Sequence, residues 1–119
     1  MPGPLDGVRV LDLTGVVSGP FATMFLADQG ADVLKIEPIG SDITRRSRAT
    51  IDKDGECSAL FISSNRGKRS LSIDVKSTVG REILARLVAQ ADVLVQNFGP
   101  VPWSGLGSAP MNCASAIRA

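Results

Sequence analysis

The fold is decided by the stretch "VRVLDLTGVVSGPFATMFLADQGADVLKIEP", which spans residues 8–38. It opens with a short apolar run rich in β-branched residues, and this run predicts a buried strand over 8–13. Apolar residues at helical spacing follow and predict a helix that ends at Gly30. The segment "ADVLKIE" (31–37) predicts a second strand. Strand, helix and strand within about thirty residues make a βαβ unit, whose two strands run parallel.

A second unit of the same kind is expected further along the chain. The segment 66–76 alternates apolar and polar residues, which predicts a half-exposed strand, and "ADVLVQN" (91–97) predicts a buried one. Between them, Ser77 can cap a helix over 77–90 whose apolar face holds Val79, Ile83, Leu84, Leu87 and Val88. The pattern of "SALFISSN" (58–65) favours neither helix nor strand. The expected fold class is therefore α/β, with two similar parallel βαβ halves.

Composition narrows the function classes. The 119 residues are enough for about one small domain. A net charge of +1 and 4% aromatic residues give no basis for nucleic-acid binding, and no apolar run is long enough to cross a membrane. The chain has no histidine, and its two cysteines, Cys57 and Cys113, are far apart, so neither a histidine triad nor a metal site is expected. The first residues do not resemble a signal peptide, so a cytoplasmic setting is expected.

Three segments should meet where the parallel strands end, which is where doubly wound sheets bind their ligands. They are "GVVSGP" (15–20), "EPIGSD" (37–42) and "NFGP" (97–100). The first is glycine-rich and opens a helix, with Pro20 suited to the first helical position and Ser18 or Gly19 to the cap. It is either a tight turn or a cradle whose backbone N–H groups bind a phosphate, although the third glycine of a dinucleotide fingerprint is missing.

Charged residues leave several alternatives open. The basic residues Arg66, Lys68 and Arg69 form either an exposed turn or an anion clamp. The cluster of Arg45, Arg46 and Arg48 is expected in a solvated loop. Asp12 lies inside a strand pattern, where it would be buried with a pKa set by its partners. No pair of carboxylates has the arrangement expected of a general acid and base.

A family resemblance goes beyond these patterns. The motifs "PLDGVRVLDLTGVVSGPFATMFLADQGADVLKIEPIGSD", "NRGKRSLSIDVKS" and "ADVLVQNF" resemble, in order and register, the start of family III CoA-transferases, the CaiB/BaiF type. This group also includes the α-methylacyl-CoA racemases, but "TGVVSGP" and "NRGKRSLSIDVK" are more similar to the transferases. The resemblance covers residues 4–98.

The resemblance implies a Rossmann-like large domain that binds coenzyme A, as an acyl-CoA substrate, along its strand ends. The CoA contacts that it implies are Val17, Ser18, Ile73, Asp74, Val75, Lys76, Asn97, Phe98 and Gly99. In the family an arginine often follows the second strand and another usually follows "NF". Pro38 and Gly99 stand in those places here, which weakens the expected grip on the CoA phosphates.

The resemblance further implies a reaction that moves CoA from a thioester to a free carboxylic acid, in an interlocked homodimer and without a metal. The nucleophile is an aspartate that lies downstream of this chain in the family, so the 119 residues alone are expected to be inactive. The alternatives are a non-catalytic CoA- or nucleotide-binding module and part of an α-methylacyl-CoA racemase.

The helix and strand patterns stop at Gly99, and residues 99–119 are interpreted as an out-of-frame or disordered tail. Met111 has a single codon, so reading one base earlier turns the codon of Asn112 into glutamate. The same shift turns the codon of Cys113 into leucine. With permitted synonymous codons, the whole tail becomes the continuation that the family has after "NF".

A one-base deletion in the codon after Phe98 would explain this agreement. We predict that the DNA, read one base earlier from this point, encodes the family's continuation over the length of the tail. Sequencing the genomic DNA across the codon for Phe98 tests this. Third bases that give an unrelated peptide in that frame would contradict the hypothesis.

Overall fold

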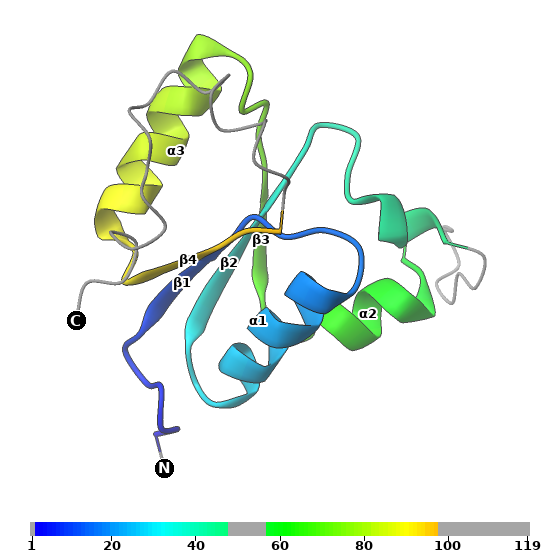
Figure 1. Ribbon diagram of the computed structural model, residues 1–119, viewed down its shortest axis with the longest axis vertical. Coiled ribbons are helices and arrows are strands. Elements are labelled where there is room, and N and C mark those ends of the chain that lie inside the picture. Colours follow the sequence, from blue (N-terminus) through cyan, green and yellow to red (C-terminus); the bar gives the residue numbers. More distant parts are fainter. Residues whose placement is uncertain (1, 48–56, 98–119) are drawn as a thin grey trace.

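A computed structural model describes residues 2–47 and 57–97 (Figure 1). The expectations for Arg48, Phe98, Gly99 and the tail lie outside this range. Its elements are β1 (Arg9–Asp12), α1 (Ser18–Asp28), β2 (Asp32–Glu37), a 3-10 helix (Ile43–Arg46), α2 (Ala59–Asn65), β3 (Arg69–Ser72), α3 (Thr78–Gln90) and β4 (Val93–Val95). The expected α/β class is confirmed.

The strands form one parallel sheet in the order β3-β2-β1-β4. Leu11 in β1 is level with Leu34 in β2 on one side and Leu94 in β4 on the other. This is the order of a dinucleotide-binding sheet, in which the chain returns to the far side of β1 after its third strand. The two βαβ units therefore differ: β1 and β2 are neighbours, whereas β3 and β4 lie at opposite edges of the sheet.

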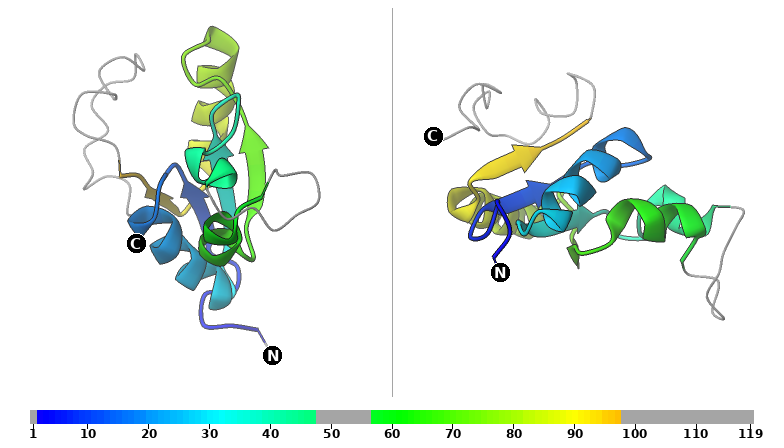
Figure 2. Two further views of the ribbon diagram at one scale, coloured as in Figure 1. Left: turned by 90° about the vertical axis from the view of Figure 1, so that its right-hand side faces the viewer. Right: turned by 90° about the horizontal axis from the view of Figure 1, so that it is seen from below.

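Helices cover the sheet from both sides (Figures 1 and 2). On one face, Leu11 and Ile36 pack with Leu84 of α3. On the other face, Val10 and Val33 pack with side chains of α1, among them Leu26. Alternate residues of each strand thus belong to different cores, which explains why the strands read as continuous apolar runs.

The first helix begins earlier than the sequence indicates. It starts at Ser18, after Val17, and no side chain caps it, so neither Ser18 nor Gly19 is the cap. Pro20 is the third helical residue and is buried. Proline is tolerated there because the first N–H groups of a helix have no partner within it. Gly30, with φ of 100°, follows the end of the helix as expected.

Helices α2 and α3 settle the undecided segment 58–65 and the predicted cap at Ser77. Residues 59–65 are helical, and the hydroxyl of Ser58 accepts a hydrogen bond from the N–H of Phe61. In α3 the cap predicted at Ser77 is confirmed by a 2.9 Å hydrogen bond from the N–H of Gly80. None of the helices in the described part of the chain is both long and apolar enough to cross a bilayer.

The predicted apolar face of α3 is only partly buried. Leu84 lies in the core, and Leu87 and Val88 pack against it, whereas Val79 and Ile83 are exposed. Within the described residues, α3 therefore packs on the sheet through the part of this face that holds Leu84, Leu87 and Val88.

Candidate functional site

The turn after β1 and the end of β4 are joined by one side chain. The amide of Asn97 donates to the carbonyl of Gly15 at 2.8 Å and accepts from the N–H of Gly15 at 3.0 Å. The two strands are neighbours, and the connection that follows β1 leads to β2, which lies on the opposite side of β1 from β4. Such a switch point is the usual ligand site of an open α/β sheet.

The turn itself carries backbone strain. Val16 has φ of 67°, a conformation that is rare for a β-branched residue and typical of functional sites. The side chains of Val16 and Val17 are exposed beyond the carboxyl end of β1, and Ser18 is exposed as well. Gly19 approaches Thr14 so closely that an added Cβ would lie 2.3 Å from the threonine Cβ.

The segment after β3 offers two kinds of side chain. Ile73 is buried in the core with Leu84, so only its backbone can reach a ligand. Val75 is partly buried against the same core. Asp74 and Lys76 are exposed, and a carboxylate oxygen of Asp74 accepts the N–H of Lys76 at 2.9 Å. In the segment 73–76, Ile73 and Val75 therefore pack in the core, whereas the side chains of Asp74 and Lys76 are accessible to a ligand.

Asp12 is fully buried below the turn and is ionised. Its carboxylate accepts from the N–H and hydroxyl of Thr14 at 2.9 and 2.5 Å, the hydroxyl of Thr23 at 2.6 Å and the Lys68 Nζ at 2.9 Å. Burial alone would raise the pKa of Asp12. The hydrogen bonds from Lys68, Thr14 and Thr23 outweigh it and hold the pKa below its usual value. The burial expected from the strand pattern is confirmed.

Two more ion pairs lie on the same face of the sheet. The buried Lys35 contacts Asp42 at 3.0 Å and donates to the carbonyl of Thr14 at 2.9 Å. Glu37 binds the guanidinium of Arg45 through both carboxylate oxygens, at 2.8 and 2.7 Å. Burial pushes the pKa of Glu37 upward, but hydrogen bonds from Arg45, from Ser70 and from the backbone of Asp42 lower it to about 2.

The basic turn is largely exposed, as one of its two readings expects, since Arg66 and Arg69 lie at the surface and only the side chain of Lys68 is buried. Its charges are nevertheless paired within the fold. Arg66 pairs with Asp28, Lys68 with Asp12 and Arg69 with Asp32. Each positive charge is matched by a carboxylate of β1, α1 or β2, so the turn fixes the α2–β3 connection to the sheet. The sequence showed the basic residues but not their partners.

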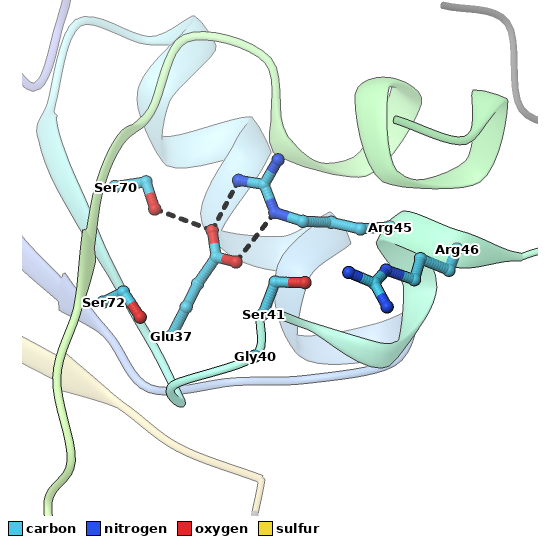
Figure 3. A pocket seen from close by; sticks show the side chains of 7 residues that line it. All are labelled: Glu37, Gly40, Ser41, Arg45, Arg46, Ser70 and Ser72. Atoms are coloured by element: carbon cyan, nitrogen blue, oxygen red, sulfur yellow. Dashed lines mark hydrogen bonds and ion pairs between the residues drawn. The ribbon is translucent and has the colours of Figure 1, made fainter. Parts of the chain in front are cut away.

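Residues Ile43–Arg46 of the loop expected to be solvated form a 3-10 helix, in which Thr44 is buried. The guanidinium carbon of Arg45 lies 3.9 Å from the centre of the Phe61 ring, whereas the side chain of its neighbour Arg46 is exposed. A pocket of about 380 Å³ opens at the carboxyl ends of β2 and β3 (Figure 3). Its lining includes Glu37, Ser41, Arg45, Arg46, Ser70 and Ser72. Sequence analysis placed segment 37–42 at the strand ends, but it did not predict that Arg45, Arg46 and the serines of β3 line a pocket with it. A lysine inside an apolar strand, Lys35, was the available sign of ionic contacts nearby.

These features define a class of protein. A parallel sheet in this order, a strained turn at its switch point and a polar pocket at its second strand are typical of a domain that binds a nucleotide-like ligand. Within residues 2–47 and 57–97, no three side chains of the metal-binding types gather in one place.

Sequence comparison identifies the family. Residues 5–116 match the model of CoA-transferase family III. The chain belongs to this family.

Individual relatives agree with this assignment. The chain is 50% identical over 99 residues to a succinyl-CoA:mesaconate CoA-transferase of Haloarcula hispanica, covering 81% of this chain and 25% of the relative. It is 50% identical over 101 residues to a formyl-CoA:oxalate CoA-transferase of Rhodopseudomonas palustris, covering 84% and 23%. A crystal structure of a CAIB/BAIF family protein from Brucella suis superposes with a TM-score of 0.85 at 38% identity, covering 98% of this chain and 32% of that one. The chain spans about a quarter of the length of these curated relatives.

We predict that losing a charge partner is costly at Asp12 and cheap at Asp32. Lys68→Met leaves a buried carboxylate without its cation, which should lower the free energy of unfolding by about 3–5 kcal/mol. Arg69→Met breaks a pair whose side chains are 66% and 48% exposed, and should cost less than about 1 kcal/mol. Urea denaturation at pH 7 measures both. Equal costs would contradict the structural role of the buried pair.

We also predict that the protein loses stability in acid through Glu37. The pKa of this carboxyl is about 2 in the folded chain and 4.5 in the reference state, so its contribution is complete above about pH 5 and is lost as the pH falls towards 2. That contribution is on the order of 3 kcal/mol. Denaturation at several pH values should show a shallower decline for Glu37→Gln. Asp6→Asn, at an exposed position, is the control and should follow the wild type. Parallel curves for Glu37→Gln and the wild type would refute this assignment.

Proposed function

We propose that this chain forms the CoA-binding part of a CoA-transferase, an enzyme that moves CoA from a thioester to a free carboxylic acid. The observation that carries the proposal is the contact of Asn97 with both backbone groups of Gly15, since it builds a preformed turn at the switch point of the sheet. The relatives named above are CoA-transferases, which supports the same ligand.

The accessible groups suit different parts of CoA. Val16 and Val17 offer exposed apolar surface beside the switch point, fitting the pantetheine arm. Asp74 and Lys76 lie past the end of β3, at the other side of the sheet. Three strand spacings, about 14 Å, separate β3 from β4, so a ligand that contacts both ends must be long and extended. CoA meets this requirement.

The remaining steps of the reaction belong, in this proposal, to further parts of the enzyme. They include the aspartyl nucleophile, the selection of the acid substrate and the interlocked dimer, all in the cytoplasm. Coenzyme A enters as the acyl-CoA substrate, and no metal takes part. The polypeptide of 119 residues by itself should therefore bind CoA without transferring it.

We predict that calorimetry with the 119-residue protein detects binding of CoA and no comparable binding of NAD or ATP. The same preparation should exchange no CoA between a thioester and a free acid. A preference for NAD would favour an ordinary dinucleotide-binding module, and measurable exchange would place the nucleophile within this chain.

A variant of the switch point tests the site itself. Asn97→Ala removes both contacts to Gly15 and should weaken CoA binding about tenfold, because the turn is then no longer fixed. Gln29→Ala removes an exposed side chain at the C-terminal end of α1, away from the strand ends, and should bind CoA as the wild type does. Unchanged affinity in Asn97→Ala would exclude this turn from the site.

A further inference from the structure

The pocket at the ends of β2 and β3 contains a positive charge that forms no ion pair with a carboxylate of the described residues. Arg45 is paired with Glu37 through two hydrogen bonds. Arg46, next in the chain, is exposed and forms no ion pair with any described residue. Figure 3 shows the side chains of Arg46 and Ser41 directed towards each other across the pocket. The pocket therefore holds a hydroxyl and a cation that has no ion-pair partner in the part of the chain that the structure describes.

Glu37 stands where dinucleotide-binding folds place the acid that recognises a ribose, at the end of the second strand. In those folds the carboxylate accepts hydrogen bonds from the free ribose hydroxyls. Here the carboxylate is buried and already accepts from Arg45, from Ser70 at 2.7 Å and from the N–H of Asp42 at 3.2 Å. It has no capacity left for a ribose diol.

The backbone that carries Arg46 is held in place. Asp42 caps the 3-10 helix through the N–H of Thr44 at 2.8 Å and is itself bound by Lys35. The hydroxyl of Ser58 donates to the carbonyl of Thr44 at 2.5 Å. Arg46 is thus presented from a fixed support, so less freedom is lost when it binds an anion.

We propose that this pocket selects a ribose that carries a phosphate over one with a free diol, and that Arg46 binds that phosphate. The proposal rests on the proposed function, since CoA differs from NAD and ATP in bearing a phosphate on its ribose 3′-oxygen. An arginine near the second strand performs the same task for a phosphorylated ribose in other dinucleotide-binding folds. Ser41 adds a hydrogen-bond donor beside it.

Calorimetry with CoA and with 3′-dephospho-CoA tests the proposal on the 119-residue protein. The wild type should bind CoA about tenfold or more tightly than dephospho-CoA, as expected for a charged hydrogen bond. Arg46→Ala should lose this preference while binding dephospho-CoA as the wild type does. Arg86→Ala removes an equal, exposed charge on α3 outside the pocket and should keep the preference. Adenosine 3′,5′-bisphosphate and adenosine 5′-monophosphate should show the same contrast.

The outcomes separate the two proposals. Equal affinity of the wild type for CoA and dephospho-CoA, or an unchanged preference in Arg46→Ala, overturns the role of Arg46 and leaves CoA binding standing. Absence of binding to either ligand overturns both. The side chain of Arg46 makes no hydrogen bond or ion pair with another described residue, so circular dichroism should show an intact fold in Arg46→Ala.

Discussion

The carboxylate of Asp12 is the constraint on which the rest of the structure depends. It is fully buried at the end of the central strand β1, and an ionised group there needs both a cation and several hydrogen bonds. Thr23 of α1 and Lys68, just before β3, supply them from two distant parts of the chain. Lys68 also donates to the carbonyl of Pro20 and to Asn65, so one ammonium group joins the first strand, the first helix and the α2–β3 connection. Their positions on this face of the sheet follow from the need to neutralise a single charge.

One face of the sheet is stabilised by apolar packing, and the other by apolar packing together with buried ion pairs. The face towards α3 is apolar, with Leu11 and Ile36 packed on Leu84. The face towards α1 and α2 is apolar only near the beginning of the strands, where Val10 and Val33 lie. Near the strand ends it becomes ionic, at Asp12, Lys35 and Glu37. Since hydrogen bonds to buried charges have demanding geometry, this part of the sheet is held more specifically than apolar packing would hold it. The candidate ligand pocket opens at the same end.

Sequence patterns predicted what depends on neighbours along the chain. Strands β1 and β2, helix α3 and its Ser77 cap follow from periodicity and local chemistry. The sheet order was not predictable in this way, because the pairing of β4 with β1 joins residues more than eighty positions apart, as Val10 and Val93 show. The same holds for the ion pairs. Asp12 and Lys68 are 56 positions apart, so the sequence left an anion clamp open although each charge of the basic turn is paired with a carboxylate of this chain. The family resemblance predicted contact residues but not their burial, as Ile73 illustrates.

The turn after β1 is fixed before any ligand arrives. Val16 keeps its unfavourable backbone conformation because the residues around it are anchored. Gly15 is held by the side chain of Asn97, and Gly19 packs tightly against Thr14, whose N–H and hydroxyl are in turn bound to Asp12. The strain at Val16 is therefore sustained from both sides, by β4 and by the buried carboxylate. A turn held in this way loses little freedom on binding, so more of the contact energy with a ligand becomes affinity. The buried carboxylate of Asp12 thus helps to fix the backbone of the turn, and the fixed turn leaves the side chain of Val16 exposed to a ligand.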